Sequence, residues 1–166
     1  MAQLVDLADF SYGKYELSRG MYTDLDLQEY LDRYEKRYLL SCLGSELYDI
    51  VSAELPIPTT ARIIDIVDPF NFDHNFNIVQ SEGMKEMVRG FIYYEYVKDL
   101  TNQMTINGNV VPTSENSSNP TTLYNTMFNR FNEAIRTYNA IQYRIILNRG
   151  DYPEFNGQQK ELAYWI

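Results

Sequence analysis

Apolar residues recur every three or four positions in two long stretches of the second half of the chain, which predicts two amphipathic helices. The pattern is most regular over residues 122–148, and Gly150 and Pro153 follow it. The other helix is expected over 81–104, with Ser81 as a candidate N-cap. Its tyrosines widen the apolar surface over most of its circumference, so we expect it to lie centrally in the bundle or between subunits. Gly90 in its middle predicts the close approach of another backbone. These two helices should be the longest and should pack antiparallel.

The first half of the chain predicts shorter elements. Apolar residues from Leu27 to Cys42 keep the same three-to-four spacing after a candidate cap at Thr23 or Asp24, and Gly44 suits the position just after a helix. Ser45 is a candidate cap for a second short helix, which the prolines beginning at Pro56 stop. One or two further helical turns are expected within 59–67. The fold class is therefore mostly α, a helical bundle of about four helices.

Two terminal segments flank a predicted helical domain over 23–150. Residues 1–22 show no helical period, and we expect an extended N-terminal arm or a short strand pair there. Residues 151–166 predict a turn followed by a short C-terminal tail. Because its end is apolar, we expect this tail to dock on a surface. Its last residues are Tyr164, Trp165 and Ile166.

Residues 68–77, DPFNFDHNFN, alternate aromatic residues with Asp and Asn. One interpretation is a metal or acid/base cluster formed by Asp68, Asp73 and His74. The other is a loop whose Phe70, Phe72 and Phe76 fill the bundle, while Asp and Asn form local turns. We favour the loop, because His74 is the chain's single histidine.

A polar stretch of seventeen residues, 104–120, separates the two long helices. Connections between packed helices usually have about 2–8 residues, so this one is unusually long. Asn107-Gly108 favours a type I′ turn, which predicts a projecting β-hairpin-like ribbon over 104–113, with 114–120 as its return. Since an isolated hairpin is marginally stable in water, we expect a neighbouring subunit to order it.

The composition points to interaction rather than to catalysis. There are 15 tyrosines, an amphipathic residue common in interfaces, but one Cys and one His, too few for the usual zinc sites. No phosphate-binding loop or nucleophile motif occurs, and no pair among the 23 acids stands out as catalytic. We therefore expect no enzymatic activity, cofactor or metal. Without a secretory signal or an apolar stretch long enough to span a bilayer, a soluble intracellular product is expected.

Charge is unevenly distributed along the chain, whose net charge is −9. Residues 1–80 hold 14 acids and 6 bases, whereas 122–150 hold four arginines and a single acid, Glu133. The arginines are Arg130, Arg136, Arg144 and Arg149. They are either a solvated helix face or one half of a head-to-tail contact between copies.

Three segments resemble a known family in their order and spacing. They are YLLSCLGSELYDIV (38–51), DPFNFDHNFNIVQSEGMKEMVRGFIYYEYVKDLTNQMT (68–105) and NGNVVPTSENSSNP (107–120). They resemble small head–tail connector, or neck ring, proteins of tailed phages of Bacteroidetes hosts, including the crAss-like phages. The similarity covers roughly residues 23–148.

The resemblance implies a structural virion protein without enzymatic activity or cofactor. The subunit would form a homo-oligomeric ring, expected to be a dodecamer, in the virion neck after assembly in the host cytoplasm. Its partners would be the portal protein and other neck or tail rings, and genomic double-stranded DNA would pass without sequence-specific binding. No membrane is involved. The alternative is a soluble, phage-encoded regulatory or host-interaction binding protein.

The candidate interface residues lie in the long loop and in the tail. No catalytic, cofactor-binding or metal residue is assigned. The candidates for contact with another subunit or the portal are Ile106, Asn107, Gly108, Asn109, Val110, Val111, Glu115, Asn116, Tyr164, Trp165 and Ile166.

Overall fold

The computed structural model describes residues 3–17, 24–101, 104–105, 108–109 and 120–162, and these are mostly helical, as predicted. The helices are α1 (Asp24–Leu43), α2 (Ser45–Glu54), α3 (Ala61–Val67), α4 (Met84–Thr101) and α5 (Pro120–Leu147). An antiparallel hairpin consists of β1 (Phe70–His74) and β2 (Asn77–Ser81). A shorter antiparallel pair consists of β3 (Met104–Thr105) and β4 (Gly108–Asn109).

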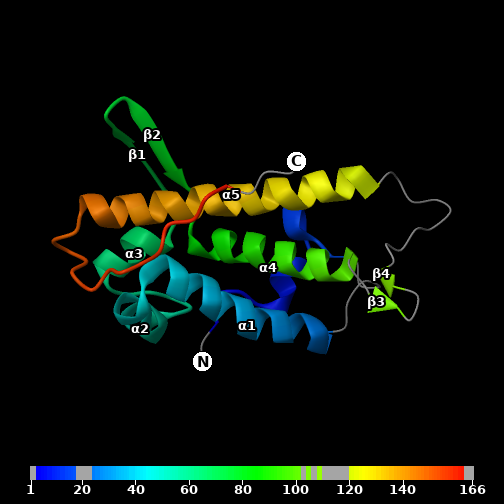
Figure 1. Cartoon of the computed structure of the whole chain (residues 1–166). Helices are drawn as coiled ribbons and strands as arrows, with labels where there is room; N and C mark the ends of the chain where they lie inside the picture. Colours follow the sequence, from blue (N-terminus) through cyan, green and yellow to red (C-terminus); the bar gives the residue numbers. More distant parts are fainter. Residues whose placement is uncertain (1–2, 18–23, 102–103, 106–107, 110–119, 163–166) are drawn as a thin grey trace.

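Helix α4 is the central element, with α1 on one side and α5 on the other (Figure 1). Phe91 of α4 stacks on Tyr38 of α1, with ring centroids 4.0 Å apart. On the other side it meets the ring of Tyr138 of α5 at 6.1 Å, and further along α4 Tyr94 meets Phe128 at 5.8 Å. Contacts thus move toward the start of α5 as α4 advances, so the two helices run in opposite directions.

Gly90 lets α4 and α5 approach closely, as its position in the middle of a helix predicts. A Cβ atom at Gly90 would lie 2.9 Å from the Cβ of Ala134 and 3.3 Å from the carbonyl oxygen of Arg130. Contacts this short leave no room for a larger side chain.

Three expectations about the helices were wrong. Helix α4 begins at Met84 rather than at Ser81, because Ser81 ends β2 and its Oγ accepts a hydrogen bond from the Gly83 N–H at 3.1 Å. With 18 residues, α4 is also shorter than α1, which has 20, so only α5 matches its predicted rank. Ser45 is the first residue of α2 rather than its cap, a position that Gly44 takes with a positive φ of 80°.

The N-terminal segment is not an extended arm or a strand pair. Residues 3–17 form two short 3-10 helices, Leu7–Phe10 and Gly13–Tyr15, and bury five apolar side chains in the chain's own core. The buried side chains are Leu4, Val5, Phe10, Tyr15 and Leu17. The segment belongs to the core because a carboxylate of α1, Glu35, accepts the N–H groups of Leu4 and Val5 at 2.9 and 3.1 Å.

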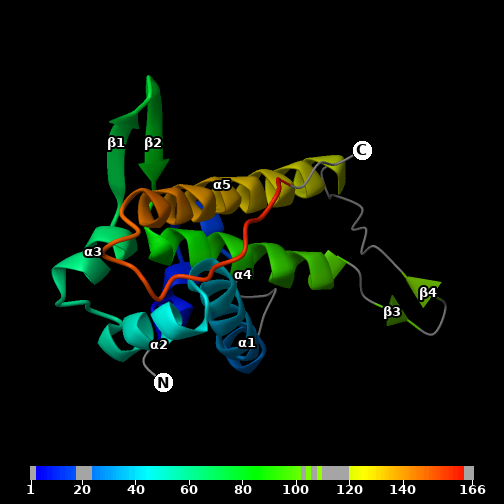
Figure 2. The ribbon, with the colours of Figure 1, turned by 60° about the vertical axis from the view of Figure 1, so that its left-hand side comes forward.

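Over the part that the structure describes, the C-terminal tail packs on the body. It leaves the end of α5 and runs back across α1 and α5 (Figures 1 and 2). Tyr152 and Phe155 are buried, and the N–H of Gln158 donates to the carbonyl oxygen of Ser41 at 2.8 Å. The candidates Tyr164, Trp165 and Ile166 lie outside the described residues.

Candidate interaction surface

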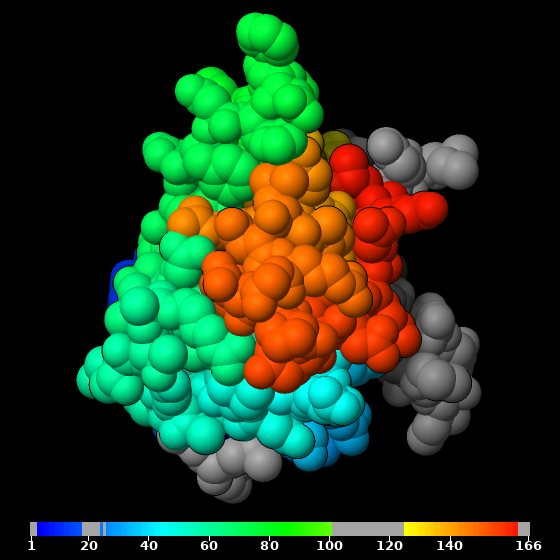
Figure 3. Space-filling view, turned by 90° about the vertical axis from the view of Figure 1, so that its left-hand side faces the viewer, coloured from blue at the N-terminus to red at the C-terminus, as the bar shows by residue number. Residues whose placement is uncertain are grey.

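The β1–β2 hairpin projects from the body beside α5 (Figures 1 and 3). Its strands pair from Phe70 with Ser81 to His74 with Asn77, and Asn75-Phe76 forms the two-residue turn. Both turn residues have positive φ, 49° and 65°, which is the combination of a type I′ turn. Asn adopts this conformation readily, whereas a bulky residue such as Phe is rarely found there.

Phe76 at the tip is fully exposed, so it does not fill the bundle as the loop interpretation expected. The reason is the two-residue period of a strand, which places Phe70, Phe72 and His74 on one face and Asn71 and Asp73 on the other. The turn then carries Phe76 beyond both faces. Ile78, which pairs with Asp73, is also 77% exposed.

The aromatic face of the hairpin packs on α5. The guanidinium of Arg144 lies 4.4 Å from the ring centroid of Phe70, and its Nε donates to the Oδ2 of Asp65 at 2.7 Å. Nearer the tip, the His74 ring meets the Tyr143 ring edge-on at 5.6 Å. These contacts hold the base of the hairpin and leave its tip free of the body.

No acid/base or metal cluster is assembled in the hairpin. Asp68 lies at the C-cap of α3, while Asp73 and His74 lie on opposite faces of β1. Within the described ranges, no group of three His, Cys, Asp or Glu residues is arranged to hold a metal ion.

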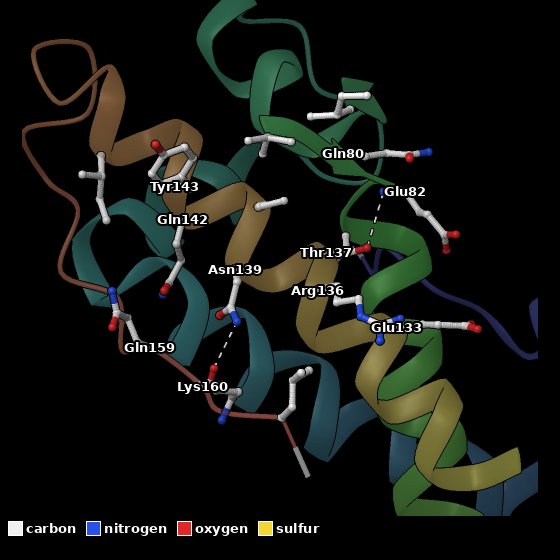
Figure 4. Close-up of a pocket in the computed structure, with 15 residues that line it drawn as sticks. Gln80, Glu82, Glu133, Arg136, Thr137, Asn139, Gln142, Tyr143, Gln159 and Lys160 are labelled. Atoms are coloured by element: carbon white, nitrogen blue, oxygen red, sulfur yellow. Dashed lines mark hydrogen bonds between the residues drawn. The ribbon is translucent and has the colours of Figure 1, made fainter. Parts of the chain in front are cut away.

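A groove of about 770 Å³ lies between β2, α5 and the tail (Figure 4). Its polar rim includes Arg136, Asn139 and Gln159. Its apolar lining consists of Ile78, Val79, Ala140, Tyr143, Ile146 and Leu162. Tyr143 and Ile146 are 38% and 41% exposed, so apolar surface is accessible in the groove.

Side chains of α5 hold the tail wall of this groove in place. Gln142 donates from Nε2 to the carbonyl oxygens of Cys42 and Gln158, at 2.9 and 3.0 Å. Asn139 donates from Nδ2 to the carbonyl oxygen of Lys160 at 3.1 Å, a bond drawn in Figure 4. Specific hydrogen bonds of the folded chain therefore fix the tail wall of the groove.

The lining of the groove holds two carboxylates, Glu82 and Glu133, and two cations, Arg136 and Lys160. Its carboxylates are already paired, since the Nζ of Lys14 lies 2.7 Å from Glu82 and 3.4 Å from Glu133. Arg136 is exposed and has no ion-pair partner in the part of the chain that the structure describes. The Lys160 ammonium lies 5.6 Å from the Tyr138 ring centroid, and burial, followed by nearby Arg37, lowers the pKa of Lys160.

Most of the predicted interface residues lie outside the described part of the chain. The exceptions are Gly108 and Asn109, which form β4 and pair with Thr105 and Met104. A ribbon beginning at Met104 is thus confirmed, but Gly108 is paired in a strand and is not a central turn residue. The residues outside are Ile106, Asn107, Val110, Val111, Glu115, Asn116, Tyr164, Trp165 and Ile166.

The β1–β2 hairpin and the groove are the features that the sequence interpretation missed. Alternating aromatics followed by Asn75 were a usable hairpin signal. No comparable signal exists for the groove, because its walls come from three separate segments.

No described helix is both long and apolar enough to cross a membrane. Comparison of the chain with protein-family models, curated proteins and solved structures gives no match.

Proposed function

We propose that this chain is a structural subunit of a head–tail connector ring, joining the portal of a tailed phage to its tail. The observation that supports this best is the projecting β1–β2 hairpin, which presents a fully exposed Phe76 at the end of a rigid body. Aromatic residues such as Phe are enriched in the buried centres of protein interfaces, so an exposed Phe at the tip of a projecting hairpin is a candidate contact. The sequence resemblance supplies the class of assembly.

A closed ring requires two different surfaces on each subunit, one of which binds the other surface of the next copy. The hairpin tip and the groove are two such surfaces, distinct in shape and in charge. In this proposal, the bundle of α1, α2, α4 and α5 is the body of the subunit, and twelve copies surround the DNA conduit. A net charge of −9 suits a conduit, because an acidic lining would not neutralise the phosphates of passing DNA.

The test is the stoichiometry of the purified chain, alone and co-produced with a portal protein from the same genome. Mass photometry and electron microscopy should show a particle of fixed subunit number with cyclic symmetry. A chain that stays monomeric and never binds the portal would overturn the proposal. A monomer or dimer that instead captures a host protein would support the alternative of a regulatory or host-interaction binder.

A further inference from the structure

We propose that the groove between β2, α5 and the tail accepts the β1–β2 hairpin of a second copy of this chain, with Phe76 as the inserted side chain. The inference rests on the proposed self-assembly and names the contact that produces it. Four observations support it: the conformation of the tip, the lining of the groove, the charges of both, and the direction in which the hairpin points.

The tip of the hairpin is unfavourable as an isolated structure. Phe76 combines a φ of 65° with a fully exposed ring, although a smaller polar residue would suit this turn better. Backbone outliers of this kind gather at sites of function, where an interaction compensates for their cost. Burial of the Phe76 ring by a partner would be such an interaction.

The groove offers accessible apolar surface and enough space for an aromatic ring. Tyr143 and Ile146 of α5 present accessible apolar surface, the small side chain of Ala140 belongs to the same lining, and Leu162 adds to it from the tail. A volume of about 770 Å³ exceeds the needs of one ring, so neighbouring residues of the hairpin can enter with it.

The hairpin is acidic, and the groove offers it an exposed cation, Arg136, that has no ion-pair partner among the described residues. Residues 68–81 contain Asp68 and Asp73 and no Lys or Arg. Asp73 is exposed on the outer face of the hairpin, directly opposite Ile78. In the groove, the exposed Arg136 is the cation best placed to meet an entering carboxylate, because the groove's own carboxylates are already paired with Lys14. Complementary charge of this kind favours the correct partner and register.

The hairpin points away from the groove beside it. β2 forms one wall of that groove, while the tip extends beyond the body (Figures 1 and 3). A chain therefore cannot insert Phe76 into its own groove without dismantling the wall. The occupant must come from another molecule, and a second copy supplies a segment of the required shape and charge.

A single hairpin contact is small compared with the roughly 800 Å² per partner that a stable interface usually buries. It would be weak between two isolated subunits. In a closed ring each subunit makes two such contacts, and the contact that closes the ring forms within one particle, so the ring is more stable than an open chain of the same subunits. Self-association should therefore rise steeply with concentration rather than build up gradually.

Disulfide trapping between two different variants tests the occupant directly. One copy carries Phe76→Cys and the other Gln159→Cys, an exposed position in the groove. The native Cys42 is buried and does not compete. Mild oxidation of the mixture should give a Phe76→Cys/Gln159→Cys heterodimer, whereas Asp49→Cys, exposed on α2, should give none with the same partner. If the bond forms only after residues 163–166 are removed, the chain's own end occupies the groove and the inference falls.

Substitutions then measure the strength of the contact. Phe76→Asn keeps a residue that tolerates positive φ and should weaken self-association by about tenfold or more, as expected for an aromatic residue central to an interface. The matched control is Ile57→Asn, because Ile57 is 78% exposed in the turn after α2, away from hairpin and groove. Circular dichroism and the melting temperature should stay unchanged in both variants.

A charge exchange checks the register. Asp73→Arg and Arg136→Asp should each weaken self-association, and a chain carrying both should recover it. Equal assembly of wild-type chain and Phe76→Asn would overturn the inference while leaving the proposed ring intact. A trapped, Phe76-dependent dimer that never closes into a ring would overturn the ring and keep the contact. A chain that does not self-associate, alone or with portal, would overturn both.

Discussion

A Cβ atom placed on Gly157 would lie 2.0 Å from the carbonyl oxygen of Cys42, so the tail crosses the end of α1 where only glycine fits. The same oxygen accepts the hydrogen bond from Gln142 of α5. The position of Gly157 in the tail thus depends on α1 and α5, two helices that are far apart in the sequence. Because the residues that follow it line the groove, the position of this glycine also sets the groove's tail wall.

Gly157→Ala should therefore push the tail away from α1. Forcing an extra carbon into a packed position costs about 1–3 kcal/mol of unfolding free energy. Chemical denaturation measures that loss, and hydrogen exchange should be faster at residues 156–162, whose N–H groups include the Gln158 donor to Ser41.

Gly150→Ala is the matched control, because a Cβ at Gly150 meets nothing within 4 Å. Its unfolding free energy should stay within about 0.5 kcal/mol of that of the wild-type chain. Equal effects of the two substitutions would mean that the close approach of Gly157 to Cys42 does not hold the tail.

The helices could be predicted because their information is local. Residues 122–148 keep their apolar spacing over many turns, so α5 was found with its ends nearly correct. Gly90 was recognised as a close contact because a glycine in the middle of a helix costs stability and needs a reason.

What the sequence did not reveal depends on distant residues. The N-terminal segment folds onto the core through Glu35, about thirty positions away, and the sequence of residues 3–17 alone does not predict this contact. Phe76 was placed in the core because it is apolar, yet the strand period and the turn carry it into solvent. The groove exists because β2, α5 and the tail meet in space.

Glu35 should make stability depend on pH. Burial raises the pKa of this carboxyl above its ordinary value of 4.5, although the hydrogen bonds from the Leu4 and Val5 N–H groups lower it in part. The folded chain then binds a proton more readily than the unfolded chain does. The contribution of Glu35 to stability is therefore fully present below pH 4.5 and is lost as the pH rises through the raised pKa.

Denaturation across this pH range should show the effect as a difference between wild-type chain and Glu35→Gln. Gln cannot ionise, so the variant should lack the part of the decline that begins near pH 4.5. Glu16→Gln, at an exposed position, should follow the wild-type profile. Parallel profiles for Glu35→Gln and wild-type chain would show that Glu35 titrates alike in both states.

Deletion of Thr105–Thr113 separates the long connection from the core. In the described part of this connection, β3 and β4 pair only through Met104–Asn109 and Thr105–Gly108. So short a ribbon contributes little stability to a subunit. The deletion should leave the helical signal and the melting temperature nearly unchanged, while ring assembly or portal binding is lost. A deletion that unfolds the subunit would place this segment in the core instead.

Arg144→Lys should loosen the β1–β2 hairpin without changing its tip. The guanidinium of Arg144 pairs with Asp65 through two nitrogens and also lies over the Phe70 ring, a combination that a lysine ammonium cannot reproduce. We expect a loss of about 1 kcal/mol and faster hydrogen exchange at residues 70–81.

Arg149→Lys is the control, because Arg149 is exposed beyond the end of α5, and no ion pair of its side chain occurs among the described residues. If Arg144→Lys leaves exchange in the hairpin unchanged, the packing of its aromatic face is sufficient to hold it. If exchange rises, self-association should weaken as well, because a mobile hairpin must be ordered before Phe76 can enter a neighbouring groove. Weaker self-association of a variant that keeps Phe76 would then show that the orientation of the hairpin contributes to the contact in addition to Phe76 itself.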